Sequence, residues 1–301
     1  MTDIKLFSTA NGVAEIDGSA VGLERALQSL FERNLEVFLG VRFLASEYAT
    51  SNGGRMDTLG IDENGCPVII EYKRDKNDNV INQGLFYLDW LMDHRAAFEL
   101  LVRDTLGKDQ AARIEWAAPR LICIAGDFNK FDEHAVKQMS RNIELVRYRK
   151  YGEELLLLEL LTAVSVDTAT AFKRPIAAAG TGNYKTVSQY LADADENLTN
   201  LYDDLRGFMV GLGDDVQEKT LRYYIAFRRI KNFACVEIQP RGGIIKLFLK
   251  VDPDRVVIEP GFTRDVRTVG HYGTGDLEIS ISNQGDLEKA KPLITQSYEN
   301  S

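Results

Sequence analysis

Apolar residues recur every three or four positions along residues 20–39, and this spacing predicts an amphipathic helix. The segments that follow alternate with turn sequences. They predict three strands, at residues 41–50, 56–61 and 66–73. Asn64 and Gly65 stand between the last two strands, where an Asn-Gly dipeptide is a strong signal for a β-hairpin.

Helices and strands then alternate along the chain. A long helix is predicted over residues 80–106 and a short one over 131–140, with strands at 120–126, 143–149 and 154–161. The apolar run at 120–126 is typical of a strand buried on both faces of a parallel sheet. The order helix, three strands, helix, strand, helix, two strands predicts an α/β domain with a mixed central sheet flanked by helices.

A second, smaller unit follows a stretch without periodicity. Residues 164–185 are rich in Ala, Thr and Gly and are interrupted by Pro175, which is typical of a linker. Beyond it we expect a helix at 186–212, a second short helix, strands near 233–239, 243–251, 255–259 and 276–282, and a closing helix near 285–298. The predicted organisation is a domain at 1–165, a linker at 166–185 and an α+β domain at 186–301.

Composition narrows the function classes. The chain has 301 residues, which suits two domains, and 45% of them are hydrophobic, which excludes wholesale disorder. Lys and Arg number 36 against 45 Asp and Glu, a net charge of −9. This balance argues against a chain that coats nucleic acid or an anionic membrane by bulk charge. It leaves open a local basic groove, or a site where a metal ion supplies the positive charge.

Other residue types bear on location and on metal chemistry. No apolar run reaches about 18 residues and the N-terminus lacks a signal-peptide pattern, so we expect a cytoplasmic protein without a membrane span. The three cysteines are far apart and are expected to be buried thiols. With only three histidines, any metal site must rely on carboxylates.

The hairpin centred on Asn64 carries the most informative pattern. Asp57 lies seven residues before this centre and Glu71 seven after it, so an antiparallel ribbon places them opposite each other. Opposed residues have Cβ atoms about 4.5–5.5 Å apart, and two acidic groups so close repel unless a divalent cation lies between them. Lys73 is two residues past Glu71 and points to the same face.

An acidic pair with a neighbouring lysine suits phosphodiester hydrolysis. Mg²⁺ takes carboxylate and phosphate oxygens and polarises the phosphoryl group. A lysine can orient the attacking water or stabilise the developing negative charge. The competing interpretation is an exposed hairpin on which Glu71 and Lys73 form an ordinary surface pair, and the residues alone leave both open.

Here the sequence resembles a known family. Asp57, thirteen further residues and then Glu71-Tyr72-Lys73 resemble the D-x(n)-E-x-K signature of the PD-(D/E)XK nuclease superfamily. Gln83 and Tyr87 resemble the Q-x-x-x-Y element of RecB-like members. The span from the L-E-x-x-L of the first helix to residue 162 looks most like the catalytic domain of NucS/EndoMS-type endonucleases. The resemblance implies a restriction-endonuclease-like fold.

The resemblance also implies a metal site. Asp57 and Glu71 correspond to metal ligands for Mg²⁺ or Mn²⁺, and the Tyr72 carbonyl to an additional ligand. Glu24, in the first helix, stands where such nucleases often place a third carboxylate. Glu32, eight residues further along the same helix, is its rival.

Further roles follow from the same resemblance. Lys73 corresponds to the catalytic lysine, and Gln83 and Tyr87 to residues that support the site or the substrate strand. The sequence departs from the family at Met56, where proline is common. It also lacks the separate N-terminal DNA-binding and dimerisation domain of NucS, so mismatch specificity is not implied.

Basic residues are candidates for contact with nucleic acid. Arg55 and Arg74 flank the hairpin residues, and Arg228, Arg229 and Lys231 are interleaved with aromatic residues that could stack bases. The competing interpretation of this second group is a packed element with solvated arginines. The C-terminal unit resembles an uncharacterised domain family often found after restriction-type nuclease modules. The glycine-rich residues 270–276 are expected to form a connecting loop.

The sequence therefore predicts a Mg²⁺- or Mn²⁺-dependent endonuclease that acts on DNA in genome defence or repair. DNA is the expected partner, no membrane is expected, and a homodimer is left open. The alternative is a nucleic-acid-binding or sensing protein that retains the nuclease-like core without cleaving. A third class, a purely structural interaction protein, would bind neither metal nor DNA.

Overall fold

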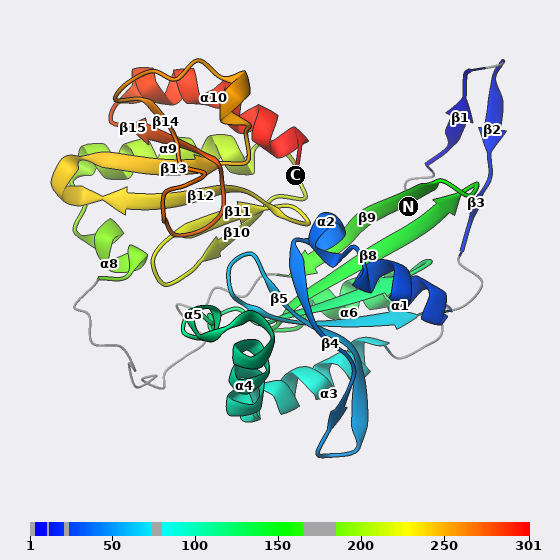
Figure 1. Cartoon of the computed structure of the whole chain (residues 1–301). Coiled ribbons are helices and arrows are strands. Elements are labelled where there is room, and N and C mark those ends of the chain that lie inside the picture. The colour runs from blue at the N-terminus through cyan, green and yellow to red at the C-terminus, as the bar shows by residue number, and fades with distance from the viewer. Residues whose placement is uncertain (1–3, 11, 21–23, 74–79, 165–184) are drawn as a thin grey trace. The chain divides into compact units, whose positions relative to one another are not determined.

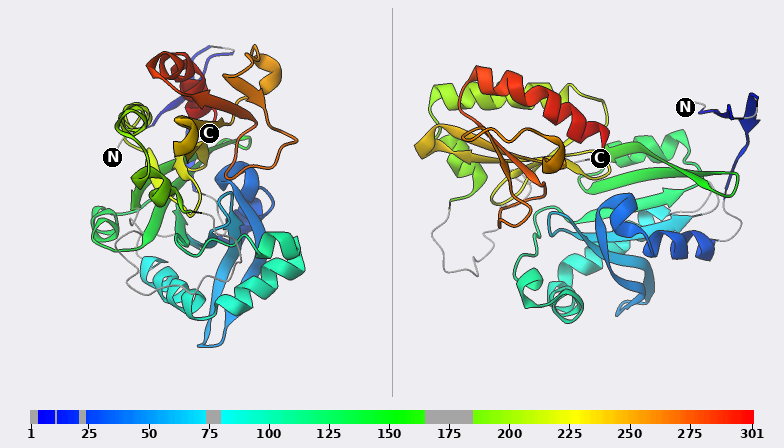
Figure 2. Two further views of the ribbon diagram at one scale, coloured as in Figure 1. Left: turned by 90° about the vertical axis from the view of Figure 1, so that its left-hand side faces the viewer. Right: turned by 45° about the horizontal axis from the view of Figure 1, so that its top comes forward.

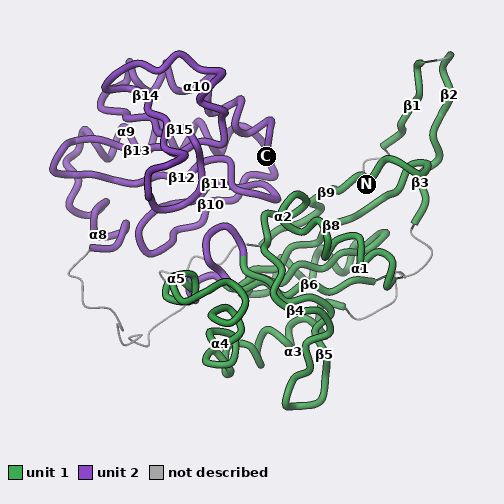
Figure 3. Tube along the Cα trace, in the orientation of Figure 1, with its two compact units in different colours: residues 1–61, 67–114, 119–164 green, residues 62–66, 115–118, 165–301 purple. Residues whose placement is uncertain are grey.

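A computed structural model describes residues 4–10, 12–20, 24–73, 80–164 and 185–301. Arg74 and residues 166–184 of the predicted linker lie outside these ranges. The chain divides into two compact units (Figure 3). Unit 1 comprises residues 1–61, 67–114 and 119–164, and unit 2 comprises residues 62–66, 115–118 and 165–301. No helix in the described ranges is long and apolar enough to cross a membrane.

Unit 1 is built on a seven-stranded mixed sheet (Figure 1). The strand order is β3-β8-β7-β6-β5-β4, with β9 paired to β8. The β6–β7 and β7–β8 pairs are parallel, and the β5–β6 and β8–β9 pairs are antiparallel. The strands are β3 (Gly18–Ser19), β4 (Val41–Thr50), β5 (Gly54–Asp62), β6 (Pro67–Lys73), β7 (Arg120–Ala125), β8 (Asn142–Tyr151) and β9 (Leu155–Val164). A separate small sheet pairs β1 (Leu6–Ser8) with β2 (Ala14–Ile16).

Helices flank this sheet. They are α1 (Glu24–Glu32), α2 (Leu35–Leu39), α3 (Val80–Asp93), α4 (Arg95–Leu106), α5 (Lys108–Ala111) and α6 (Lys130–Lys137). The Phe31 ring of α1 contacts the ring of Tyr72, and Gly84 of α3 lies against Leu121. The register places Tyr72 and Leu121 on opposite faces of the sheet, so α1 and α3 cover opposite faces. The predicted α/β class with a mixed, flanked sheet is confirmed.

Two predicted helices are each interrupted. The segment 20–39 breaks at Asn34, whose side-chain amide donates to the Leu30 carbonyl at the end of α1. The segment 80–106 breaks at His94, whose ring stacks on Trp90. Each following helix still buries apolar residues, Leu35 and Leu39 in α2 and Phe98 and Val102 in α4.

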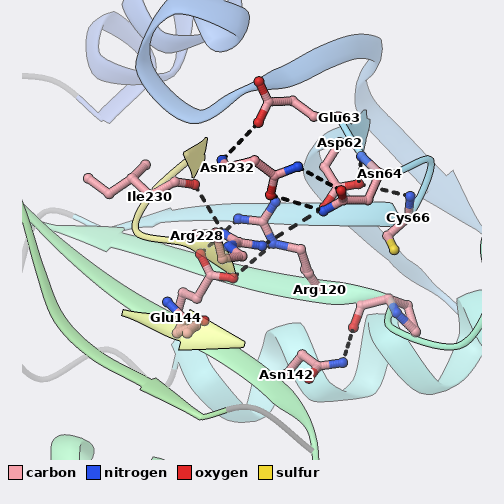
Figure 4. Close-up of polar contacts among 12 residues, drawn as sticks. Asp62, Glu63, Asn64, Cys66, Arg120, Asn142, Glu144, Arg228, Ile230 and Asn232 are labelled. Carbon is pink, nitrogen blue, oxygen red and sulfur yellow. Dashed lines mark hydrogen bonds and ion pairs between the residues drawn. The ribbon is translucent and has the colours of Figure 1, made fainter. Parts of the chain in front are cut away.

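A buried ion pair lies at one end of the sheet of unit 1. The Arg120 guanidinium on β7 donates two 2.8 Å hydrogen bonds to the Glu144 carboxylate on β8 (Figure 4). Both side chains are buried. The bidentate geometry satisfies the two charges without water, and such a pair fixes how the two strands align.

Unit 2 is an antiparallel sheet with helices on one face. The strand order is β10-β11-β12-β13-β15-β14, and α9 and α10 pack on the same apolar face (Figure 2). The strands are β10 (Gln217–Thr220), β11 (Ile225–Arg228), β12 (Asn232–Gln239), β13 (Ile244–Leu249), β14 (Thr263–Asp265) and β15 (Leu277–Ile281). The helices are α8 (Val187–Ala192), α9 (Glu196–Val210) and α10 (Gln284–Glu299). The predicted second α+β domain is confirmed as a fold class.

Three expectations for unit 2 are wrong in detail. The helix expected at 186–212 is divided into α8 and α9, and the Asp195 side chain caps the start of α9. Residues 253–255 form a turn of 3₁₀-helix that begins at Pro253, whereas a strand was expected at 255–259. The short helix expected after residue 212 is replaced by strands β10 and β11. The inward positions of β10 are Gln217 and Lys219, so the strand lacks the apolar alternation that would reveal it.

Gly84 allows α3 to approach the sheet closely. An added Cβ there would lie 2.4 Å from Leu121 Cδ1, whereas one at Gly207 in α9 would meet nothing within 4 Å. We expect Gly84→Ala to lower the free energy of unfolding by about 1–3 kcal/mol through overpacking. Gly207→Ala, the matched control, should raise it by up to about 1 kcal/mol. Urea unfolding of both variants checks this, and equal effects of one sign would contradict it.

Candidate active site

The β5–β6 hairpin folds with the register that the turn count predicts. Paired residues run from Ile61–Pro67 to Thr58–Ile70, and the next step along both strands is Asp57 and Glu71. The turn is stabilised by Asp62, whose carboxylate accepts backbone N–H groups from both Asn64 and Cys66. A tight turn of this kind fixes the register, so Asp57 and Glu71 occupy neighbouring positions on the two strands.

At Asp57 and Glu71, hydrogen bonds to side chains replace the backbone hydrogen bonds between β5 and β6. The Asp57 N–H donates to Glu71 Oε1 at 3.2 Å, and the Tyr72 N–H donates to Asp57 Oδ2 at 2.9 Å. Glu71 is completely buried, yet its second oxygen, Oε2, has no hydrogen-bond partner among the described residues. An unpartnered buried carboxylate oxygen is costly, so this position is suited to a proton or a cation.

Burial changes the acidity of both groups. Burial, and after it the nearby negative charge of Asp57, raises the pKa of Glu71 to about 9. Burial also raises the pKa of Asp57 to about 6, against the opposing effect of the Tyr72 N–H. The positive charge of Lys73 lowers both pKa values. At pH 7 the pair therefore retains about one proton, which a divalent cation would displace.

The two rival glutamates of α1 have different surroundings. Glu24, at the first position of α1, is half-buried, and its charge raises the pKa of Asp57. Glu32 accepts hydrogen bonds from the Thr58 hydroxyl at 2.7 Å and the Gln28 amide at 3.1 Å. Gln28 also donates to the Asp57 carbonyl at 2.8 Å. Glu32 thus belongs to a hydrogen-bonded network on the side of Thr58 and Gln28, whereas Glu24 acts on Asp57 through its charge.

Gln83 and Tyr87 are brought together on α3. The Gln83 amide donates to the Tyr87 hydroxyl at 3.3 Å, and the same hydroxyl accepts the Arg55 N–H at 3.1 Å. The Tyr87 ring fills the space beside Gly54, where an added Cβ would lie 2.7 Å from it. Tyr87 thus fixes the start of the strand that carries Asp57.

This arrangement predicts a graded loss of stability. Tyr87→Phe removes the acceptor of the Arg55 N–H and should lower the free energy of unfolding by about 1–2 kcal/mol. Gln83→Ala leaves that acceptor in place and should cost less. Urea unfolding at neutral pH checks the order, and a Tyr87→Phe variant as stable as the wild type would contradict it.

Glu47 is a carboxylate near the pair that the sequence reasoning missed. Its charge raises the pKa of both Asp57 and Glu71. Its Oε2 lies 3.3 Å from the Arg55 guanidinium. A count across the preceding turn would have revealed it, because Glu47 and Asp57 are each five residues from Asn52.

The acidic pair has the donor set of a hard divalent cation. Carboxylate oxygens suit Mg²⁺ and Mn²⁺, and Mg²⁺ typically keeps several waters and uses only one or two carboxylates. The orphaned Glu71 oxygen fits such an ion. Within the described ranges, however, no three His, Cys, Asp or Glu side chains are gathered closely enough to form a metal site by themselves.

The basic residues predicted to contact nucleic acid differ in their exposure and in their partners. Arg55 is largely exposed, and Arg74 lies outside the described residues. Arg229 donates to Asp215 at 2.6 Å and stacks on Tyr298, and Lys231 is half-buried.

Arg228 requires a correction. Its guanidinium is buried and donates to the Arg229 and Ile230 carbonyls (Figure 4). It also lies 3.9 Å from the Asp62 carboxylate. A side chain so enclosed is a structural cation, and the prediction that it contacts nucleic acid is wrong.

Comparisons with known proteins identify several similarities. Residues 187–301 match a family described as a domain of unknown function, DUF5655. An uncharacterised protein of Haemophilus influenzae is 28% identical over 305 aligned residues, which cover 98% of this chain and all of that protein.

Two solved structures match part of the chain. One is a complex of EndoMS with double-stranded DNA, with a TM-score of 0.30 and 21% identity over 43% of this chain and 46% of that one. The other is a repair endonuclease from Pyrococcus abyssi, with a TM-score of 0.28 and 20% identity over 44% of this chain and 49% of that one. The chain thus spans about half the length of these two structures.

Proposed function

We propose that this protein is a divalent-cation-dependent endonuclease that hydrolyses DNA phosphodiester bonds, with a role in genome defence or repair. The observation that carries the proposal is the unpartnered, buried Glu71 oxygen beside Asp57, with Lys73 on the same strand. Acidic groups so placed are unstable without a proton or cation, and a phosphodiester is a substrate that requires added positive charge.

Each residue of the site then has a role. Asp57 and Glu71 hold Mg²⁺ or Mn²⁺, with the Tyr72 carbonyl and Glu24 as accessory ligands. The bound cation supplies positive charge that polarises the phosphoryl group. Lys73 orients the attacking water and stabilises the negative charge that develops on the phosphate. Gln83 and Tyr87 position the strand of Asp57.

The acidic composition of the chain is consistent with this proposal. A net charge of −9 disfavours tight, metal-free binding to DNA. We therefore expect DNA affinity to depend on the divalent cation and on a few exposed basic residues such as Arg55. In this proposal residues 186–301 form a recognition or regulatory domain, and a homodimer stays a prediction.

The second candidate is a nucleic-acid-binding or sensing protein that does not cleave. The observation that favours it is that no group of three metal-ligating side chains is assembled in the described ranges. Calorimetric titration of the full chain with Mn²⁺ separates the two candidates. Saturable binding that Glu71→Ala abolishes, together with Mg²⁺-dependent cleavage in a panel of single-stranded, duplex, mismatched and RNA substrates, supports the enzyme. DNA binding without cation binding supports the second candidate.

A further inference from the structure

The β4–β5 hairpin brings a third carboxylate, that of Glu47, beside the strand of Asp57, where it pairs with Arg55. Its turn is closed by the Gly53 N–H donating to the Thr50 carbonyl and by the Thr50 hydroxyl donating to the Gly54 carbonyl. Three residues along each strand from Thr50 and Gly54 lie Glu47 and Asp57. Glu47 on β4 and Asp57 on β5 are thus equally far from this turn, and the count along the β5–β6 pair leads from Asp57 to Glu71.

The backbone of Glu47 is held in an unusual conformation. Its φ is 52°, and within the described ranges it is the one non-glycine residue in the left-handed region. Such a conformation costs about 1–3 kcal/mol and persists where the surroundings impose it, often at functional sites. The neighbouring Ser46 hydroxyl accepts the Gln28 amide that also bonds the Asp57 carbonyl, so this part of β4 is tied to the strand of Asp57.

Glu47 forms a weak ion pair with Arg55, and either side chain can exchange it for another partner. Glu47 and Arg55 form an ion pair at 3.3 Å, with 48% and 63% of their side chains exposed. A solvent-exposed pair contributes little free energy. Arg55 lies two residues before Asp57 on β5, so its side chain points to the same side of the strand.

We propose that Glu47 is a further acidic residue of the cation site and that Arg55 is its exchangeable counter-ion. In the resting protein Glu47 pairs with Arg55, and this exposed ion pair is weak enough to be exchanged. When a phosphodiester arrives, Arg55 turns to the phosphate, and Glu47 is released toward the cation or its water shell. This inference rests on the proposed function and names a residue outside the set that the sequence motif implies.

Mn²⁺ calorimetry without nucleic acid tests the role of Glu47. Glu47→Gln should weaken Mn²⁺ binding about threefold to tenfold, the effect of losing one screened charge. The matched control is Glu153→Gln, which removes an exposed, ion-paired glutamate in the turn between β8 and β9 and should leave the affinity unchanged. Glu47→Ala and Glu47→Gly should weaken binding equally, but the glycine variant should melt at the higher temperature because glycine relieves the strain.

A double-mutant cycle tests the exchange. Arg55→Met should tighten Mn²⁺ binding in the wild type by freeing Glu47, and should lose this effect in the Glu47→Gln background. An effect that persists in that background would be a general charge effect and would overturn the exchange. Unchanged affinity in Glu47→Gln, while Asp57→Asn abolishes binding, would overturn the role of Glu47 and leave the proposed function intact. A wild-type chain that binds no Mn²⁺ would overturn the proposed function itself.

Discussion

Lys73→Met and Asp57→Asn should each reduce the rate of DNA cleavage by at least about a hundredfold, since removal of one group that stabilises transition-state charge typically costs 10²–10³ in rate. The two losses have different causes. Lys73→Met removes the charge that faces the phosphate and leaves the acidic pair intact, so Mn²⁺ should still bind. Asp57→Asn removes a ligand, so Mn²⁺ affinity and cleavage should fall together.

The measurement is single-turnover cleavage at saturating Mg²⁺, with Mn²⁺ calorimetry on the same preparations. Lys137→Met, on the exposed surface of α6, is the matched control and should cleave at the wild-type rate. Cleavage that survives both site substitutions would remove the site assignment. A wild-type chain that binds Mn²⁺ and DNA without cleaving would leave the site in place and favour the sensing protein.

The opposition of Asp57 and Glu71 could be predicted because a tight hairpin turn fixes register. Residues at equal distances before and after Asn64 pair across the hairpin, and the observed pairs from Ile61–Pro67 to Thr58–Ile70 follow this rule. Counting five residues from Asn52 in each direction likewise gives Glu47 and Asp57. Glu47 was missed because it belongs to no family motif, and its left-handed backbone has no signature in the sequence.

The burial of the Arg228 side chain could not be predicted in the same way. On strand β11, Phe227 and Arg228 point to opposite faces of the sheet, and an outward arginine is normally solvated. What encloses Arg228 is its own following loop and the carboxylate of Asp62, which is more than 160 positions earlier in the sequence. Local patterning indicates which face a residue occupies, but not which distant segment covers that face.

Replacing Glu71 with Gln should remove the loss of stability that the wild type shows as the pH rises. The folded pKa of Glu71 is about 9, against an ordinary value of 4.5, so the folded protein holds a proton that the unfolded chain releases. The stability gained from this proton is fully present below pH 4.5 and is lost as the pH rises through about 9. Glutamine mimics the protonated acid at every pH, so the variant keeps that stability.

The size of the expected loss of stability follows from the shift in the pKa of Glu71. At about 1.4 kcal/mol per pKa unit, the wild type should lose on the order of 3–6 kcal/mol between pH 5 and pH 9 that the variant retains. Asp57→Asn should retain a smaller part of this free energy of unfolding, because the pKa of Asp57 rises only to about 6. Urea unfolding at pH 5, 7 and 9 measures the difference, with Glu153→Gln as the control.

Mn²⁺ makes the test specific to the site. A saturating cation should restore the stability of the wild type at pH 9, because it replaces the lost proton beside Glu71 Oε2. It should not stabilise Glu71→Gln to the same extent, because the amide is a poorer ligand and carries no charge. Parallel pH profiles for the wild type and the variant would mean that Glu71 ionises as freely in the folded protein as in the unfolded chain. Its buried oxygen would then be satisfied by a group other than a proton or a cation.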